Sequence, residues 1–133
     1  MLISKTELRV RYAETDQMSF VYYGNYAQYY EIGRVEALRQ LGTSYKLLED
    51  SGIMMPVVSM NINYKKPALY DDILTVKTII KELPTNKIRF EYEIYNHKEE
   101  LINTAETILV FVNKTTKRPC KCPQWFLDLF VGF

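Results

Sequence analysis

The sequence predicts an α+β fold in which a curled antiparallel β-sheet wraps around one long central α-helix. Three observations lead to this prediction. One helical segment is much longer than any other, strand-like segments follow it one after another, and short turns separate them. Consecutive strands joined by short turns form antiparallel sheets. One helix covers only one face of such a sheet, so we expect two layers with the helix on the concave side.

The length of 133 residues fits one domain, and we expect residues 1–133 to form it. The net charge of +1 creates no global field that would attract nucleic acid or an anionic membrane, so neither partner is expected. The N-terminal segment lacks the apolar stretch of a signal peptide. No apolar run reaches the length of about 18 residues that a membrane-spanning helix needs. These features favour a cytoplasmic protein.

The first two elements differ in the spacing of their apolar residues. Residues 7–12 alternate polar and apolar side chains, which predicts a short strand. From Asn25 to Leu41 the apolar residues have helical spacing and form one face. That face consists of Tyr26, Tyr29, Tyr30, Gly33, Ala37, Leu38 and Leu41. Asn25 is the predicted N-cap, and Gly42 is the predicted end of the helix.

A short helix and four strands are expected in the rest of the chain. Residues 44–50 predict the short helix, which ends before Gly52. The β-rich segments are residues 56–66, 73–83, 88–95 and 101–113. Residues 96–98 predict a hairpin turn between the last two strands. The tail from Pro123 predicts a short amphipathic helix or a partner contact.

The edges of the predicted sheet are open. An apolar strand edge is a template for pairing with another chain. Soluble proteins that associate with copies of themselves do so mostly with closed symmetry. The sequence therefore predicts self-association, as a dimer or a tetramer.

Several kinds of chemistry lack the residues they need. No glycine-rich nucleotide-binding motif and no G-x-S-x-G nucleophile motif is present. The only histidine, His97, lies in the predicted hairpin turn. Cys120 and Cys122 are too close for a usual disulfide and have no second pair for a zinc site, so we expect free thiols. Carboxylates, backbone dipoles and tyrosine hydroxyls remain available for catalysis.

Asp16 has a structural and a catalytic interpretation. Thr-Asp is a common turn dipeptide, so Asp16 fits a turn or a cap. It also lies just before the predicted start of the long helix, where unpaired N–H groups and a partial positive charge polarise a carbonyl oxygen. Asp16 would then attack the carbonyl carbon or activate a water molecule. Such attack suits an activated acyl group such as a thioester.

Two stretches resemble the 4-hydroxybenzoyl-CoA thioesterase family, within the hotdog-fold acyl-CoA thioesterases. The first is RVRYAETDQMSFVYYGNYAQYYEIGR, and the second is MPVVSMNINYKKPALYDDILTVKT. The similarity extends over residues 5–120. The resemblance implies a hotdog fold and hydrolysis of an acyl-CoA to CoA and a carboxylic acid. It also implies an active site between two subunits and no metal or redox cofactor.

Through this resemblance, Asp16 corresponds to the catalytic carboxylate of the family. Tyr23 corresponds to the residue at the helix start whose backbone N–H polarises the thioester carbonyl. The chain departs from the family pattern at Gln17, Met18 and Ser19, where relatives often carry small residues. These bulkier side chains reshape the predicted acyl pocket, so the acyl group itself is left open.

The remaining candidates are substrate-binding positions. Near the helix start they are Val21, Tyr22 and Tyr26, and on the strand that follows the helices they are Val58, Ser59 and Met60. Glu31 is a second candidate carboxylate, and its spacing also allows an ion pair with Arg34. In an enzyme that binds CoA, cations should meet the nucleotide phosphates. The candidates for that role are Lys65, Lys66, Lys114, Lys117 and Arg118.

Three rival functions remain open. A thioesterase acting on acyl carrier protein would need a basic docking surface, which the net charge of +1 does not indicate. A hotdog hydratase or dehydratase would rely on a histidine, and His97 is badly placed for it. A non-catalytic acyl-binding module would have to tolerate Asp16 beside an apolar cavity, and an unpaired carboxylate is costly there.

Overall fold

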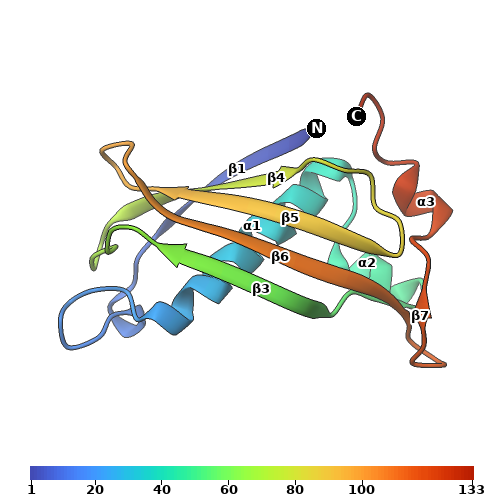
Figure 1. Ribbon diagram of the computed structural model, residues 1–133, viewed down its shortest axis with the longest axis horizontal. Helices are drawn as coiled ribbons and strands as arrows, with labels where there is room; N and C mark the ends of the chain where they lie inside the picture. Colours follow the sequence, from blue (N-terminus) through green and yellow to red (C-terminus); the bar gives the residue numbers. More distant parts are fainter.

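The computed structural model describes all residues, 1–133. The chain forms one sheet with a long helix on its concave face (Figure 1). In chain order the elements are β1 (Leu2–Arg9), η1 (Tyr12–Glu14), η2 (Tyr23–Asn25), α1 (Tyr26–Leu41), α2 (Tyr45–Asp50), β2 (Ile53–Met54), β3 (Val57–Tyr64), β4 (Ile73–Ile80), β5 (Lys87–Tyr95), β6 (Leu101–Asn113), β7 (Pro119–Cys120) and α3 (Gln124–Leu127). Here η denotes a short 3-10 helix. This is the predicted hotdog fold, with a curled antiparallel sheet and one long helix.

The seven strands form an antiparallel sheet with β1 at one edge and β3 at the other. The long strands are ordered β1-β4-β5-β6-β3, and the short β2 and β7 pair with the end of β6. Strands β3 and β4 are therefore consecutive in the chain but not neighbours in the sheet. Both sides of β4 are occupied, by β1 and β5, and β3 pairs with β6 instead.

The first strand begins and ends earlier than predicted. Strand β1 spans Leu2–Arg9 rather than residues 7–12, and all eight of its residues pair with β4. The ladder runs from Leu2 opposite Ile80 to Arg9 opposite Ile73. Beyond Arg9 the chain leaves the sheet and enters η1. Polar alternation alone did not locate this strand, because its bounds are set by its partner β4, which also ends at Ile80 rather than at residue 83.

Helix α1 buries the tyrosine-rich face that its spacing predicted. The buried residues are Tyr26, Tyr29, Tyr30, Gly33, Arg34, Ala37 and Leu38. Gly42 ends the helix in the left-handed conformation with φ 95°, as predicted. A Cβ atom on Gly33 would lie 2.5 Å from Thr78 Oγ1 and 2.8 Å from Val76 Cγ1. Glycine at this position therefore lets the helix approach β4 closely.

Arg34 is buried in the core rather than paired with Glu31. Its Nε donates to the Tyr45 hydroxyl at 3.1 Å, and its Nη1 donates to the Tyr92 hydroxyl at 3.2 Å. The Tyr92 hydroxyl is 2.6 Å from Thr107 Oγ1. The ion pair between Glu31 and Arg34 is therefore absent, because the tertiary fold directs the guanidinium toward the sheet. Hydrogen bonds to these hydroxyls offset part of the cost of burying the charge.

Burial of tyrosine hydroxyls makes the fold sensitive to alkaline pH. Desolvation raises the pKa of Tyr29 and Tyr30, and it raises the pKa of Tyr92 to about 12 against the opposing effect of Arg34. Above pH 10 the unfolded chain loses these protons before the folded chain does, so the free energy of unfolding falls as pH rises. We expect tyrosinate absorbance from these residues to appear together with loss of the circular-dichroism signal. Ionisation of all eleven tyrosines while the fold persists would contradict this.

The two faces of the sheet differ in chemistry. The outer face carries cross-strand ion pairs, with Lys81 Nζ 3.2 Å from Glu91 and Lys77 Nζ 3.6 Å from Glu93. The inner face is apolar and holds most of the core against α1. The outer face is thus suited to solvent, whereas the inner face requires cover along its whole width.

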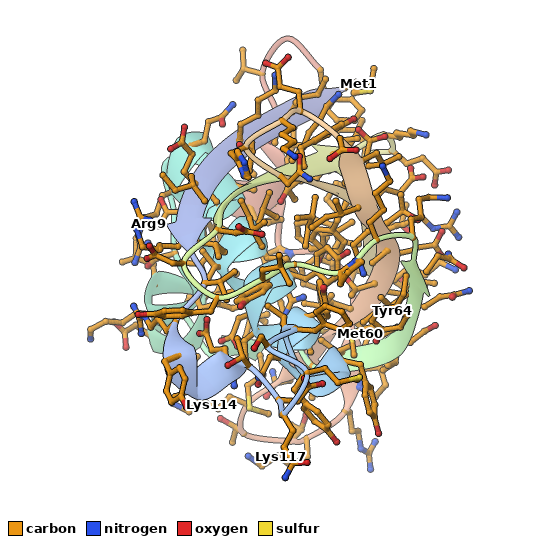
Figure 2. All side chains as sticks on the ribbon, turned by 90° about the vertical axis from the view of Figure 1, so that its left-hand side faces the viewer. Met1, Arg9, Met60, Tyr64, Lys114 and Lys117 are labelled. Atoms are coloured by element: carbon orange, nitrogen blue, oxygen red, sulfur yellow. The ribbon has the colours of Figure 1, made fainter.

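Cover is missing along β3. On the inner face Met60 lies opposite Thr107, and Tyr64 lies opposite Asn103. The two β6 residues are fully buried, yet Met60 is 47% exposed and Tyr64 is 52% exposed. Helix α1 packs mainly against β1 and β4, which lie toward the edge of the sheet opposite β3. Figure 2 shows Met60 and Tyr64 on the flank opposite Arg9, which ends β1. Of the two edges of the sheet, the β3 edge is therefore the one whose inner face lacks cover.

The C-terminal tail packs against its own chain. It forms the short helix α3, and Phe126 is buried with its ring centroid 5.9 Å from that of Phe111. The N-terminal amine donates to the carbonyl oxygen of Phe133 at 3.0 Å, which places the two ends side by side (Figure 1). None of the helices combines the length and apolar character needed to cross a lipid bilayer.

Candidate active site

The loop between β1 and α1 is fixed by backbone pairing at its base. Thr15 and Val21 form an isolated antiparallel bridge, and Phe20 forms another with Leu69. Val21 N–H also donates to the carbonyl oxygen of Ala68 at 2.8 Å. These contacts tie the loop to the segment between β3 and β4, so residues 16–19 form a tight turn in a defined position.

Asp16 occupies the first position of this turn. Its N–H donates to the carbonyl oxygen of Phe20 at 2.8 Å, and its own carbonyl oxygen accepts from Ser19 at 3.0 Å. Its carboxylate oxygen Oδ1 accepts the N–H of Met18 at 2.9 Å. Ser19 adopts a positive φ of 64°, which closes the turn. One carboxylate oxygen is therefore anchored to the backbone while Oδ2 has no hydrogen bond in the chain.

The start of the long helix leaves backbone donors unpaired. The 3-10 turn η2 leads directly into α1. Neither Tyr23 N–H nor Gly24 N–H donates to any loop or cap acceptor. The Asn25 side chain does not cap the helix as predicted, because its Nδ2 donates to the Glu14 carbonyl oxygen at 2.8 Å. The N–H groups of Tyr23 and Gly24 therefore stay free for a ligand oxygen.

Gly24 leaves room for the ring of Tyr22 in this turn. A Cβ atom there would lie 2.9 Å from the ring of Tyr22. The Tyr22 ring also lies 4.6 Å from the Tyr23 ring, measured between centroids. Glycine thus allows the Tyr22 ring to lie over the peptide that carries the free Gly24 N–H.

Asp16 and the helix start border the same pocket, which has a volume of about 310 Å³. The lining residues are Asp16, Met18, Phe20, Val21, Tyr23, Tyr26, Tyr64, Lys65, Lys66 and Pro67. Four of the predicted site residues meet here: Asp16, Val21, Tyr23 and Tyr26. The fifth predicted site residue of this region, Tyr22, is 46% exposed and does not line the pocket.

The predicted substrate-binding residues on β3 do not line this pocket in a single chain. Val58 and Met60 are 59% and 47% exposed along the open edge. Ser59 lies opposite Ile108, on the outer face of the sheet. Whether these residues contact substrate therefore depends on what covers the β3 edge.

Tyr64 is a pocket residue that the sequence did not indicate. It ends β3, its hydroxyl donates to the carbonyl oxygen of Tyr23 at 3.2 Å, and its ring packs edge-on against Tyr26. Tyr64 is 41 residues from Tyr23 in the chain, so no local pattern places them together. Only the pairing of β3 with β6 brings its side chain to the helix start.

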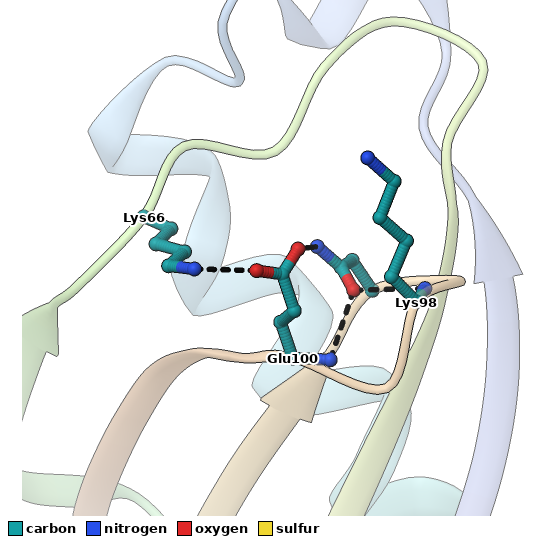
Figure 3. A network of polar contacts seen from close by, with 4 residues as sticks. Lys66, Lys98 and Glu100 are labelled. Atoms are coloured by element: carbon teal, nitrogen blue, oxygen red, sulfur yellow. Dashed lines mark hydrogen bonds and ion pairs between the residues drawn. The ribbon is translucent and has the colours of Figure 1, made fainter.

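The five candidate cations divide between the two ends of the sheet. Lys65 and Lys66 border the pocket. Lys66 forms an ion pair with Glu100, which also accepts from Asn96 Nδ2 at 2.9 Å (Figure 3). These contacts, the Lys66 hydrogen bond first, lower the pKa of Glu100. Lys65 has no ion pair, so it is the free cation at the pocket.

The other three cations, Lys114, Lys117 and Arg118, lie in the hairpin between β6 and β7. The Asn113 carboxamide oxygen holds this hairpin by accepting from Thr115 and Thr116 at 2.9 and 3.0 Å. None of the three cations forms a salt bridge. Figure 1 shows β7 at the end of the sheet opposite the loop that carries Asp16.

The remaining polar candidates lie outside the pocket. Glu31 is exposed on α1 and borders a different hollow, together with Ile32 and Glu36. His97 is exposed in the hairpin between β5 and β6, as predicted. Cys120 and Cys122 are free and partly buried, and desolvation raises the pKa of Cys122 to about 11.

The arrangement combines a half-buried carboxylate with a polarising helix start. A carbonyl oxygen placed at the free N–H groups of Tyr23 and Gly24 would carry stabilised negative charge as it is attacked. Apolar and aromatic side chains around it would exclude water from the rest of the acyl group. Such a site suits hydrolysis of an activated acyl compound by a carboxylate.

The fold is that of a hotdog thioesterase, and the chain belongs to the thioesterase-like superfamily, whose family model matches residues 10–130. The protein named "Putative acyl-CoA thioesterase YneP" from Bacillus subtilis is 40% identical over 100% of this chain and 96% of its own length. The acyl-CoA thioester hydrolase YbgC of Escherichia coli O6:H1 is 32% identical over 88% of this chain and 87% of its own.

Solved structures agree with the fold. The crystal structure of a DHNA-CoA thioesterase from Staphylococcus aureus superposes with a TM-score of 0.91 at 39% identity. The match covers 96% of this chain and 86% of that one. Because the two backbones superpose over nearly the whole chain, this sheet and helix have the fold of the hotdog thioesterases.

Proposed function

We propose that this protein is an acyl-CoA thioesterase that hydrolyses a thioester to free CoA and a carboxylic acid. The observation that carries the proposal is the shared pocket of Asp16 and the unpaired N–H groups at the start of the helix. Its relatives named as acyl-CoA thioester hydrolases support the same reaction. In this proposal residues 1–133 form one hotdog thioesterase domain, working in the cytoplasm.

In the proposed mechanism the thioester carbonyl oxygen accepts hydrogen bonds from Tyr23 and Gly24 N–H. If Asp16 acts as a base, it takes a proton from water, the resulting hydroxide bonds to the carbonyl carbon, and the C–S bond breaks. If Asp16 acts as the nucleophile, its carboxylate oxygen forms a mixed anhydride with the acyl group, which water then hydrolyses. In both routes CoA leaves as a thiolate and takes up a proton.

The pocket geometry favours neither route over the other. The Met18 N–H holds one Asp16 oxygen, which directs the free Oδ2 as either base or nucleophile. In both cases the charge that develops on the carbonyl oxygen is stabilised by the same two N–H donors.

We propose that the working enzyme is at least a dimer, paired through the β3 edges. The uncovered inner face at Met60 and Tyr64 supports this, as does the charged outer face, which is unsuited to an apolar contact. Two β3 strands related by a two-fold axis pair in antiparallel fashion. Val58 and Met60 of each subunit would then face the other subunit, close to its acyl pocket.

Antiparallel pairing also explains the two groups of cations. It brings the start of one β3 beside the end of the other, so the hairpin of one subunit approaches the Asp16 pocket of its neighbour. In our proposal Lys114, Lys117 and Arg118 then attract the phosphates of CoA, and Lys65 adds a cation at the pocket. Four chains would form by pairing two such dimers.

We propose that the acyl group, aromatic or aliphatic, is limited in size by the volume of the pocket. The motif around Asp16 supports membership of the 4-hydroxybenzoyl-CoA thioesterase family in particular. Met18 lines the pocket and is 66% exposed, so its flexible side chain adjusts the space for the acyl group.

A substrate panel tests the proposal. Acyl-CoAs of increasing chain length, aryl-CoAs and the matching acyl-pantetheine thioesters are each supplied, and released thiol is measured. We expect release from CoA thioesters, and a higher KM for pantetheine thioesters because they lack the nucleotide phosphates. Absence of thiol release from every member would overturn the proposal. Equal KM values for the two series would overturn the role of the cations.

A further inference from the structure

The hydroxyl of Tyr64 is bound to the backbone at the catalytic end of the helix. It donates to the carbonyl oxygen of Tyr23 at 3.2 Å. The Tyr64 ring stands edge-on to Tyr26 with centroids 5.4 Å apart, which fixes the direction of the hydroxyl. Strand β3 thus reaches the turn from which the free N–H donors project.

The hydrogen bond acts on one particular peptide group. The carbonyl of Tyr23 and the N–H of Gly24 belong to the same planar peptide, so holding one fixes the direction of the other. The same carbonyl oxygen also accepts the N–H of Tyr26. Donors on a peptide oxygen polarise the peptide and strengthen its N–H as a donor. The unpaired Gly24 N–H is therefore oriented and strengthened by Tyr64.

We propose that Tyr64 is a positioning residue for thioester hydrolysis: its hydroxyl orients and polarises the Tyr23–Gly24 peptide so that Gly24 N–H stabilises the developing oxyanion. This inference rests on the proposed function. It assigns a task to a β3 residue that does not itself react.

The surroundings of the hydroxyl suit this task. A tyrosine hydroxyl keeps its proton at neutral pH, and partial desolvation raises the pKa of Tyr64 further, so the hydroxyl is a donor there. Its ring lines the acyl pocket beside Tyr23 and Tyr26, so the hydroxyl lies at the wall of the pocket. Phenylalanine would preserve the ring contact and remove only the hydrogen bond.

The kinetic test compares Tyr64→Phe with Tyr12→Phe in the full-length enzyme. Tyr12 is 77% exposed, lies outside the acyl pocket and makes no hydroxyl hydrogen bond, so it is a matched control. For Tyr64→Phe we expect kcat to fall about fivefold, the worth of one neutral hydrogen bond. KM should change less than about twofold, because the contact acts through the transition state. Tyr12→Phe should match the wild type in both constants.

A second measurement does not depend on turnover. The chain has only five glycines, so selective ¹⁵N-glycine labelling gives a backbone spectrum that is simple to assign. We expect the Gly24 amide resonance to move in Tyr64→Phe, with the other glycine signals unchanged. Tyr12→Phe should leave the Gly24 resonance in place.

Two results would overturn the inference: an unchanged kcat in Tyr64→Phe, or an unchanged Gly24 resonance. If KM rose while kcat stayed constant, Tyr64 would bind the substrate directly instead. Failure of the proposed function would differ from both results, because the wild-type enzyme would then release no CoA. If the wild type hydrolyses thioesters and Tyr64→Phe is equally fast, only the role of Tyr64 fails.

Discussion

Replacing Asp16 with Asn should lower kcat for acyl-CoA hydrolysis by on the order of a thousandfold. The amide keeps the shape of the side chain, and its oxygen still accepts the Met18 N–H that now holds Oδ1. It has no charge, so it neither abstracts a proton from water nor attacks a carbonyl efficiently. Groups of this kind contribute about 10² to 10⁴ to rate. Steady-state kinetics, with substrate affinity measured separately by calorimetry, should show lost turnover and retained binding.

Glu31→Gln is the matched control for this experiment. Glu31 is the other candidate carboxylate, and it lies on the exposed side of α1, away from the acyl pocket. We expect its kcat and KM to equal those of the wild type. The assignment would be contradicted if Asp16→Asn turned over at the wild-type rate, or if Glu31→Gln lost activity in its place.

Substituting Met60 with Glu should separate the proposed dimer and reduce activity with it. Met60 faces the uncovered inner side of β3, so a two-fold contact would bury two carboxylates with no partner. Desolvation costs several kcal/mol per ion, which raises the dimer dissociation constant by on the order of a thousandfold or more. Analytical ultracentrifugation should show monomers at micromolar concentration. Specific activity should fall and should recover partly as the enzyme concentration is raised.

Asn63→Glu is the control on the same strand. Asn63 lies opposite Thr104 on the outer, polar face of the sheet, where an added carboxylate stays in water. It should sediment and react as the wild type does. A Met60→Glu enzyme that remained dimeric would contradict pairing through β3. A fully active monomer would contradict an active site completed by the second subunit.

The long helix and most of the strands were predictable because their signals are local. The spacing of Tyr26, Tyr29 and Tyr30 records which face of α1 is buried, and the structure buries all three. The alternation over residues 88–95 likewise matches β5, where every inward residue is buried. The short-range spacing of apolar residues was therefore sufficient to predict the fold class.

Features set by distant partners were not predictable in the same way. The bounds of β1 depend on its ladder with β4, more than sixty residues away in the chain. Arg34 has a local acidic neighbour at the right spacing, yet the core supplies Tyr45 and Tyr92 instead. A single sequence contains no record of these pairings, because they arise only when the sheet closes over the helix.

The candidate site likewise contains residues whose proximity follows from the local sequence and residues brought together only by the sheet. Asp16 and Tyr23 lie seven positions apart, on a loop and the helix it precedes, so their proximity follows from local order. Tyr64 joins them only through the sheet. The open β3 edge was expected in general terms, but its location required the strand order.

A crystal structure of Asp16→Asn with an acyl-CoA bound would test the central claim most directly. The account predicts that the thioester carbonyl oxygen lies within hydrogen-bond distance of Tyr23 and Gly24 N–H. It also predicts that the side chain at position 16 faces the carbonyl carbon. A thioester bound with its carbonyl away from the helix start, or with residue 16 out of reach of the carbon, would contradict the account.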